Sequence, residues 1–88
     1  MTVFLRFLAF SDRLPRSFSP FTLPDGSKAA DLLREVRRHW TETGVGTVEE
    51  RDNLEEQALL ASGGRVLQPE EALTEGQQIS VIGSILGG

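Results

Sequence analysis

The chain ends in two glycines, Gly87 and Gly88, which follow a short apolar segment. Glycine has no side chain and the widest backbone freedom, so a terminal diglycine forms a thin thread with nothing to pack. Such a thread can carry a terminal carboxylate into a narrow active site on another protein. The alternative interpretation is a frayed, solvent-exposed terminus. The residues of this end, taken alone, leave both interpretations open.

The segment before the diglycine must position it. Residues Ile79–Ile82 are β-branched at three of four places and predict a buried strand in the middle of a sheet. We expect Gly83 to loosen the backbone and residues 83–88 to form a flexible C-terminal tail. A flexible tail on a rigid strand suits the delivery of a terminal group.

The composition limits the kinds of function. With 88 residues, of which 39% are hydrophobic and 25% charged, residues 1–88 form a single globular domain. The sequence contains no cysteine, which excludes thiolate metal sites and a cysteine nucleophile. A net charge of −4 argues against binding to nucleic acid. No apolar run is long enough for a membrane helix, and the N-terminus has no signal-peptide features, so we expect a cytoplasmic protein.

Two strands are predicted at the N-terminal end. Thr2–Phe10 is rich in β-branched and aromatic residues, and alternation assigns its side chains to opposite faces. One set, expected to be buried, is Val3, Leu5, Phe7 and Ala9; the other is Phe4, Arg6, Leu8 and Phe10. Ser17–Leu23 predicts a second strand, which Pro20 confines to a sheet edge because proline cannot donate to a ladder.

One long helix is predicted after the turn at residues 24–26. Ser27 is the expected N-cap, and Gly44 the residue that follows the helix end near Thr43. Its apolar residues recur at helical spacing: Ala29, Leu32, Leu33, Val36 and Trp40. Residues 44–53 are polar and predicted to be irregular, with at most a helical turn over 48–52.

The C-terminal half predicts a hairpin and a final strand. Residues 57–61 and 65–67 flank Gly63 and Gly64, residues 69–73 predict a short helical turn, and Gly76 reverses the chain. The order is therefore β-β-α-β-β-β, an α+β roll in which one helix covers a mixed sheet. We expect the first and last strands, which are the most apolar, to lie side by side in its centre.

These features resemble the ubiquitin-like β-grasp sulfur carriers, which include the small subunit of molybdopterin synthase and the sulfur carrier of thiamine synthesis. The resemblance spans the chain and is most specific from Leu73 through Gly76 to Ile79, a Leu-x-x-Gly-x-x-Ile pattern that leads into the last strand before the diglycine. The chain departs from the family in having Gly83-Ser84 where a proline pair is common, and a longer segment at 44–53. The resemblance implies a β-grasp fold.

The resemblance also implies a reaction at Gly88. An E1-like adenylating enzyme would use ATP and Mg²⁺ to convert the Gly88 carboxylate to an acyl-adenylate. A sulfur donor would then displace AMP and leave a thiocarboxylate, which delivers sulfide to an acceptor such as the large subunit of molybdopterin synthase. The chain would be a protein substrate rather than an enzyme, with no bound cofactor or metal. Molybdopterin synthesis is the leading pathway.

A docking face completes the expected site. If Arg6 points outward, its neighbours form an exposed apolar patch, and such patches usually mark partner surfaces. The residues assigned to partner binding are Phe4, Leu8, Ile82, Ile85, Leu86 and Gly87. The alternative is that these side chains pack beneath a loop.

Two other functions remain open. A ubiquitin-like modifier would use the same activation to join Gly88 to lysines of other proteins. A β-grasp interaction domain would use the Phe4 and Leu8 face, and its diglycine would be incidental.

Overall fold

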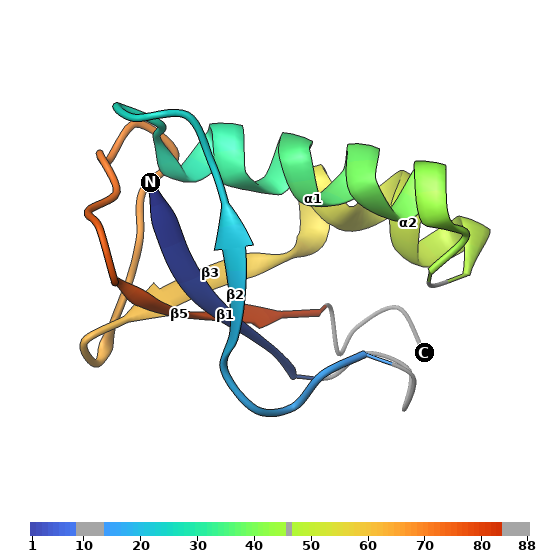
Figure 1. The fold of residues 1–88 in the computed structure, drawn as a ribbon. Coiled ribbons are helices and arrows are strands. Elements are labelled where there is room, and N and C mark those ends of the chain that lie inside the picture. The colour runs from blue at the N-terminus through green and yellow to red at the C-terminus, as the bar shows by residue number, and fades with distance from the viewer. Residues whose placement is uncertain (9–13, 46, 84–88) are drawn as a thin grey trace.

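The computed structural model describes residues 1–8, 14–45 and 47–83, which form two helices and one mixed sheet. The strands of this sheet are β1 (Thr2–Leu8), β2 (Ser19–Thr22), β3 (Leu59–Ser62), β4 (Arg65–Val66) and β5 (Gln78–Ile82). The helices are α1 (Ala29–Thr43) and α2 (Val48–Gln57). Helix α1 lies across one face of the sheet, with α2 beside its C-terminal half (Figure 1).

The first and last strands form the centre of the sheet, as predicted. The strand order is β2-β1-β5-β3-β4, and β1 runs parallel to β5. All other strand pairs are antiparallel. The strand that contains Pro20 lies at an edge, where a residue without an N–H group removes no ladder hydrogen bond that the sheet needs.

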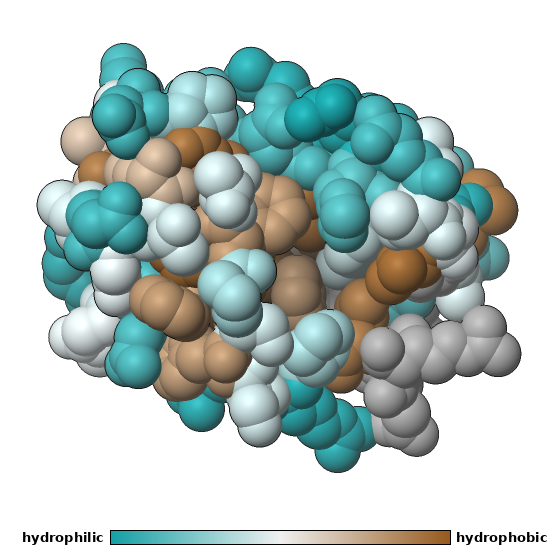
Figure 2. Space-filling model, in the orientation of Figure 1, coloured by the Kyte–Doolittle hydropathy of each residue, from teal (hydrophilic) through white to brown (hydrophobic). Residues whose placement is uncertain are grey.

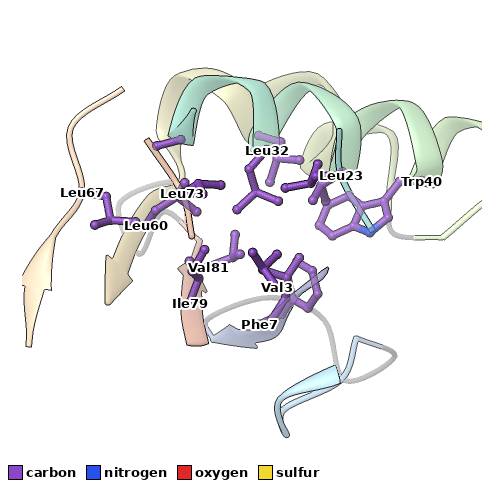
Figure 3. Close-up of a cluster of buried hydrophobic side chains, with 14 of the residues drawn as sticks. Val3, Phe7, Leu23, Leu32, Trp40, Leu60, Leu67, Leu73, Ile79 and Val81 are labelled. Atoms are coloured by element: carbon purple, nitrogen blue, oxygen red, sulfur yellow. The ribbon is translucent and has the colours of Figure 1, made fainter. Parts of the chain in front are cut away.

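The core lies between α1 and the sheet (Figure 3). Val3, Leu5 and Phe7 are buried on one face of β1, as alternation predicts, while Ala9 and Phe10 lie outside the described residues. Helix α1 buries Ala29, Leu32, Val36 and Trp40 against this face, and Leu33 packs partly against the same core. The rings of Phe7 and Trp40 meet at a centroid distance of 5.4 Å.

The N-cap prediction was wrong by one residue. Helix α1 begins after Lys28, whose backbone N–H donates to the Asp31 carboxylate at 2.9 Å. Ser27 is buried and its hydroxyl donates to the Pro24 carbonyl at 2.7 Å, so this side chain closes the preceding turn instead of capping the helix. The predicted helix end is confirmed, because Gly44 adopts a left-handed conformation with φ 73°.

A second helix replaces the irregular segment predicted at residues 44–53. Helix α2 begins at a capping box, in which Thr47 Oγ accepts from the Glu50 N–H and the Glu50 carboxylate accepts from the Thr47 N–H. Leu54 is its one buried residue, and Arg37 of α1 donates to the Arg51 carbonyl at 3.1 Å. The order is therefore β-β-α-α-β-β-β, and β3 begins at residue 59 rather than 57.

The predicted hairpin between β3 and β4 is confirmed. Gly63 and Gly64 connect the two strands with φ 61° and 81°, the backbone region in which glycine carries no steric penalty. The helical turn predicted at residues 69–73 was wrong. The chain makes a turn there and Ala72 then forms an antiparallel bridge with Lys28, which ties this segment to the start of α1.

The capping box of α2 gives a first testable prediction. Thr47→Ala removes the acceptor of the Glu50 N–H and should lower the free energy of unfolding by about 1 kcal/mol. Urea denaturation measures the change. Thr41→Ala is the matched control, since Thr41 is an exposed residue of α1, where alanine is the better helix former and stability should stay level or rise. Equal losses in both variants would contradict a capping role.

Candidate functional site

The central strand pair holds the start of the C-terminal segment. Strands β1 and β5 run parallel, so Leu8 and Ile82 lie side by side where both strands end. Beyond Ile82, the Gly83 N–H donates to the Leu8 carbonyl at 2.8 Å, and Gly83 is buried. The sheet thus holds the chain through Gly83, one residue later than expected. The other predicted site residues at this end, Ile85, Leu86, Gly87 and Gly88, lie outside the described residues.

An apolar row crosses the sheet on the face opposite α1. The strand registers pair Leu8 with Ile82 and Ile82 with Leu59, so these three side chains form one row across β1, β5 and β3. Leu8 and Ile82 are half-buried rather than fully exposed, and Leu59 is 52% exposed. The row lies next to Gly83, at the point from which the C-terminal segment leaves the sheet.

Phe4 is farther from that point than the predicted patch implied. It is half-buried on the same face of β1 as Leu8, but the register places it opposite Gln78 of β5 and Pro20 of β2. The face therefore has its apolar row at one end of the central strands and Phe4 toward the other. We use the term open face for the surface of the sheet opposite α1.

Sequence reasoning missed Leu59 and Val66 on the open face. Both are among the most exposed large apolar side chains of the described residues. Val66 of β4 pairs with Ala61 of β3, which in turn pairs with Ser80 of β5. The signal was present in the adjacent pair Leu59-Leu60. Because successive side chains of a strand point to opposite faces, burial of one of these leucines requires the other to face outward.

Arg6 lies in the middle of the open face and is held in place by two contacts. Its Nε donates to the Ser80 hydroxyl at 2.8 Å, and its guanidinium carbon lies 4.8 Å from the centre of the Phe18 ring. Ser80 is only 7% exposed, and Arg6 is half-buried. The prediction that Arg6 points away from the core is confirmed. Phe18, which was assigned to the edge strand, instead precedes β2 and covers Arg6.

A groove lies on the α1 side of the sheet, between β2 and α1. It encloses about 320 Å³ and its walls are mainly apolar, with contributions from Phe21, Trp40 and Val45. Figure 2 shows apolar side chains reaching the surface between α1 and the sheet in this view. His39 forms its polar rim and contacts Phe21 edge-to-face at 6.0 Å. A single histidine with no titratable companion in the groove gives no acid–base pair.

The described residues contain neither a metal-binding cluster nor a membrane-spanning helix. Within 1–8, 14–45 and 47–83, no three histidine, aspartate or glutamate side chains come together in a group that could hold a metal ion. Neither described helix is long and apolar enough to cross a membrane.

A charged pair ties β4 to the turn before β5. Arg65 donates to both carboxylate oxygens of Glu71, at 2.8 and 2.7 Å, and the Gln68 N–H donates to the same carboxylate. The hydrogen bonds from Arg65, followed by that from Gln68, lower the pKa of Glu71 from its ordinary value of 4.5 to about 2. The ionised carboxylate is therefore favoured in the folded state.

This pair predicts a pH dependence. A depressed folded-state pKa contributes stability that is present above pH 4.5 and is lost as the pH falls through about 2. Glu71→Gln should therefore unfold at lower urea concentration than the wild type at pH 7, and the difference should close between pH 4.5 and 2. Glu70→Gln, at the exposed neighbouring residue, should keep the wild-type profile. A constant difference between wild type and Glu71→Gln down to pH 2 would contradict the assignment.

Comparison with known proteins establishes the fold. No family model and no curated protein matches this sequence. Among solved structures, the chain is similar to the putative molybdopterin converting factor, subunit 1, from Pyrococcus furiosus, with a TM-score of 0.65 and 17% sequence identity. The match covers 97% of this chain and 99% of that chain. The predicted β-grasp fold, an α+β roll over a mixed sheet, is thus confirmed, with α2 as an additional helix.

Proposed function

We propose that this chain is a sulfur carrier whose Gly88 carboxylate is adenylated and then converted to a thiocarboxylate. The observation that carries the proposal is the geometry at Gly83, which is hydrogen-bonded to Leu8 at the end of the central parallel strands. Residues 84–88 follow that fixed point and end in the diglycine. Five residues span at most about 17 Å when fully extended, enough to reach a buried active site on a partner docked at the open face.

The similarity in fold to a protein described as a molybdopterin converting factor subunit supports the choice of pathway. We therefore assign the large subunit of a molybdopterin synthase as the acceptor of the sulfur. An E1-like adenylating enzyme and a sulfur donor complete the set of partners. ATP and Mg²⁺ belong to the adenylating enzyme, and we place the reaction in the cytoplasm, where ATP is abundant.

The chemistry requires two displacements. The Gly88 carboxylate attacks the α-phosphate of ATP, and pyrophosphate leaves. The donor sulfur then attacks the carbonyl carbon, and the bond between that carbon and the AMP oxygen breaks. If the donor is an enzyme persulfide, a second thiol cleaves the remaining sulfur–sulfur bond and leaves the thiocarboxylate on Gly88. The chain has no cysteine and cannot carry sulfur on a thiol, so the terminal carboxylate is the group that we assign to this role.

The open face is the docking surface in this proposal. The row formed by Leu8, Ile82 and Leu59 adjoins Gly83, so a partner that buries this row also receives the C-terminal segment. Burial of apolar side chains supplies binding free energy without any chemistry from this chain. The chain then acts as a protein substrate, and the adenylating enzyme and acceptor supply the catalytic groups.

Intact mass spectrometry tests the proposal. The purified chain is incubated with an E1-like adenylating enzyme, ATP, Mg²⁺ and a sulfur donor, and its mass is compared with that of a sample without ATP. We expect one oxygen to be replaced by one sulfur, located at Gly88 by fragmentation. Conjugates that join Gly88 to lysines and survive reducing agents would instead indicate a ubiquitin-like modifier. An unchanged mass with an enzyme that activates another carrier in the same assay would refute the proposal.

A further inference from the structure

Arg6 is a fixed cation within an apolar surface. The hydrogen bond from its Nε to Ser80 and the contact of its guanidinium carbon with the Phe18 ring hold the group in place. Among the described residues no hydrogen bond engages either Nη atom, so the N–H groups of both can bind a partner. The next row of the open face, two residues along β1, consists of Leu8, Ile82 and Leu59.

No carboxylate of the described residues forms an ion pair with Arg6. By contrast, four other arginines each have a carboxylate partner within 4.0 Å: Arg34, Arg37, Arg38 and Arg65. Glu75 is bonded to the Thr2 N–H, at the opposite end of β1 from Leu8. In a protein with a net charge of −4, a half-buried arginine with no carboxylate partner among the described residues offers charge complementarity to an acidic group on a partner.

We propose that Arg6 binds a carboxylate of the docking partner, and that this carboxylate is surrounded by apolar side chains which cover the row of Leu8, Ile82 and Leu59. This inference rests on the proposed function for the identity of the surface, and it adds the chemistry of the partner that fits it. Docking removes water from Arg6, and an arginine left unpaired at a desolvated interface carries a large free-energy cost. A partner with an aspartate or glutamate opposite the two Nη groups avoids that cost through paired, charge-assisted hydrogen bonds. The site therefore selects for an acidic group and rejects a wholly apolar or basic surface.

Binding measurements with the full chain test this inference. The probe is an E1-like adenylating enzyme that binds the wild-type chain, and isothermal titration calorimetry without ATP gives the Kd. Arg6→Gln keeps a polar side chain but removes the charge, and should raise Kd roughly 30-fold or more, the effect of leaving a buried carboxylate unpaired. Arg6→Glu should raise it further, because two carboxylates then face each other. Arg6→Lys keeps the charge and should recover part of the affinity.

A second variant separates charge from structure. Phe18→Ala removes the aromatic ring that covers Arg6 but leaves the cation in place, and should weaken binding less than Arg6→Gln. If Phe18→Ala weakens binding as much as Arg6→Gln, Arg6 serves only to position the segment before β2, and the inference is overturned. The same holds if Arg6→Gln leaves Kd unchanged. Thermal unfolding of each variant verifies that the compared chains are folded.

This test is distinct from that of the proposed function. A chain that forms the thiocarboxylate while Arg6→Gln binds normally would support the carrier function and overturn the role of Arg6. A chain that binds the enzyme through Arg6 and never acquires sulfur would support the role of Arg6 and refute the carrier function.

Discussion

Gly88→Ala should reduce the rate of thiocarboxylate formation by about 100-fold or more, and deletion of Gly88 should abolish it. A methyl group at the last residue crowds the approach of the carboxylate to the α-phosphate, and misplacement of a reacting group by about 1 Å can cost a factor of about 100 in rate. Deletion shortens the reach from Gly83 by about 3.5 Å, far beyond that tolerance. Intact mass spectrometry over a time course measures both rates.

Ser84→Ala is the matched control for these variants. It introduces the same side chain into the same C-terminal segment, four residues before the reacting group. Its rate should stay within a few fold of the wild type. If Gly88→Ala reacts as fast as Ser84→Ala, the diglycine is incidental and the open face is the feature to examine, as expected for an interaction domain.

Leu32→Ala should have the largest effect on stability, lowering the free energy of unfolding by about 2–5 kcal/mol. Leu32 is completely buried at the centre of the α1 stripe, between the helix and the central strands (Figure 3). Its truncation removes buried apolar surface and leaves a cavity that the sheet cannot close. A small domain has roughly 5–15 kcal/mol of total stability, so this one substitution can unfold a large share of the molecules at elevated temperature. Urea denaturation monitored by Trp40 fluorescence gives the value.

Leu59→Ala provides the comparison for the same chemical change at the surface. Leu59 is 52% exposed on the open face, so its truncation should cost roughly 1 kcal/mol or less. The ratio between the two losses reports whether the core lies on the α1 side of the sheet. Similar losses would mean that the open face is also covered in solution, for example by self-association.

The sequence predicts the central architecture because its signals there are strong and agree with one another. Alternation in β1 and the helical stripe from Ala29 to Trp40 each fix one face of an element. Pro20 can stand only at an edge, and the apolar run 79–82 suits only the centre. These constraints suffice to place the end of β5, and with it the start of the C-terminal segment.

The parts that the sequence did not predict depend on contacts between distant residues. Helix α2 has one buried residue, Leu54, and no continuous apolar stripe, so its stability comes from the capping box and its contacts with α1. Ser27 is of a type that favours N-caps, but its hydroxyl donates to the Pro24 carbonyl instead of capping α1. The covering of Arg6 by Phe18 joins residues that no local pattern connects.

The parallel pairing of β1 with β5 has a consequence for the synthesis of this protein. Residues 2–8 are translated about seventy residues before their central partner, residues 78–82. The middle of the sheet therefore cannot close until residues 78–82 have been made, and contacts of such long sequence separation form slowly. A chain truncated before residue 78 would leave β1 without its partner, exposed to aggregation and proteolysis. Completion of the fold thus reports that translation has passed β5, because a sheet that holds Gly83 can form only after residues 78–83 have been made.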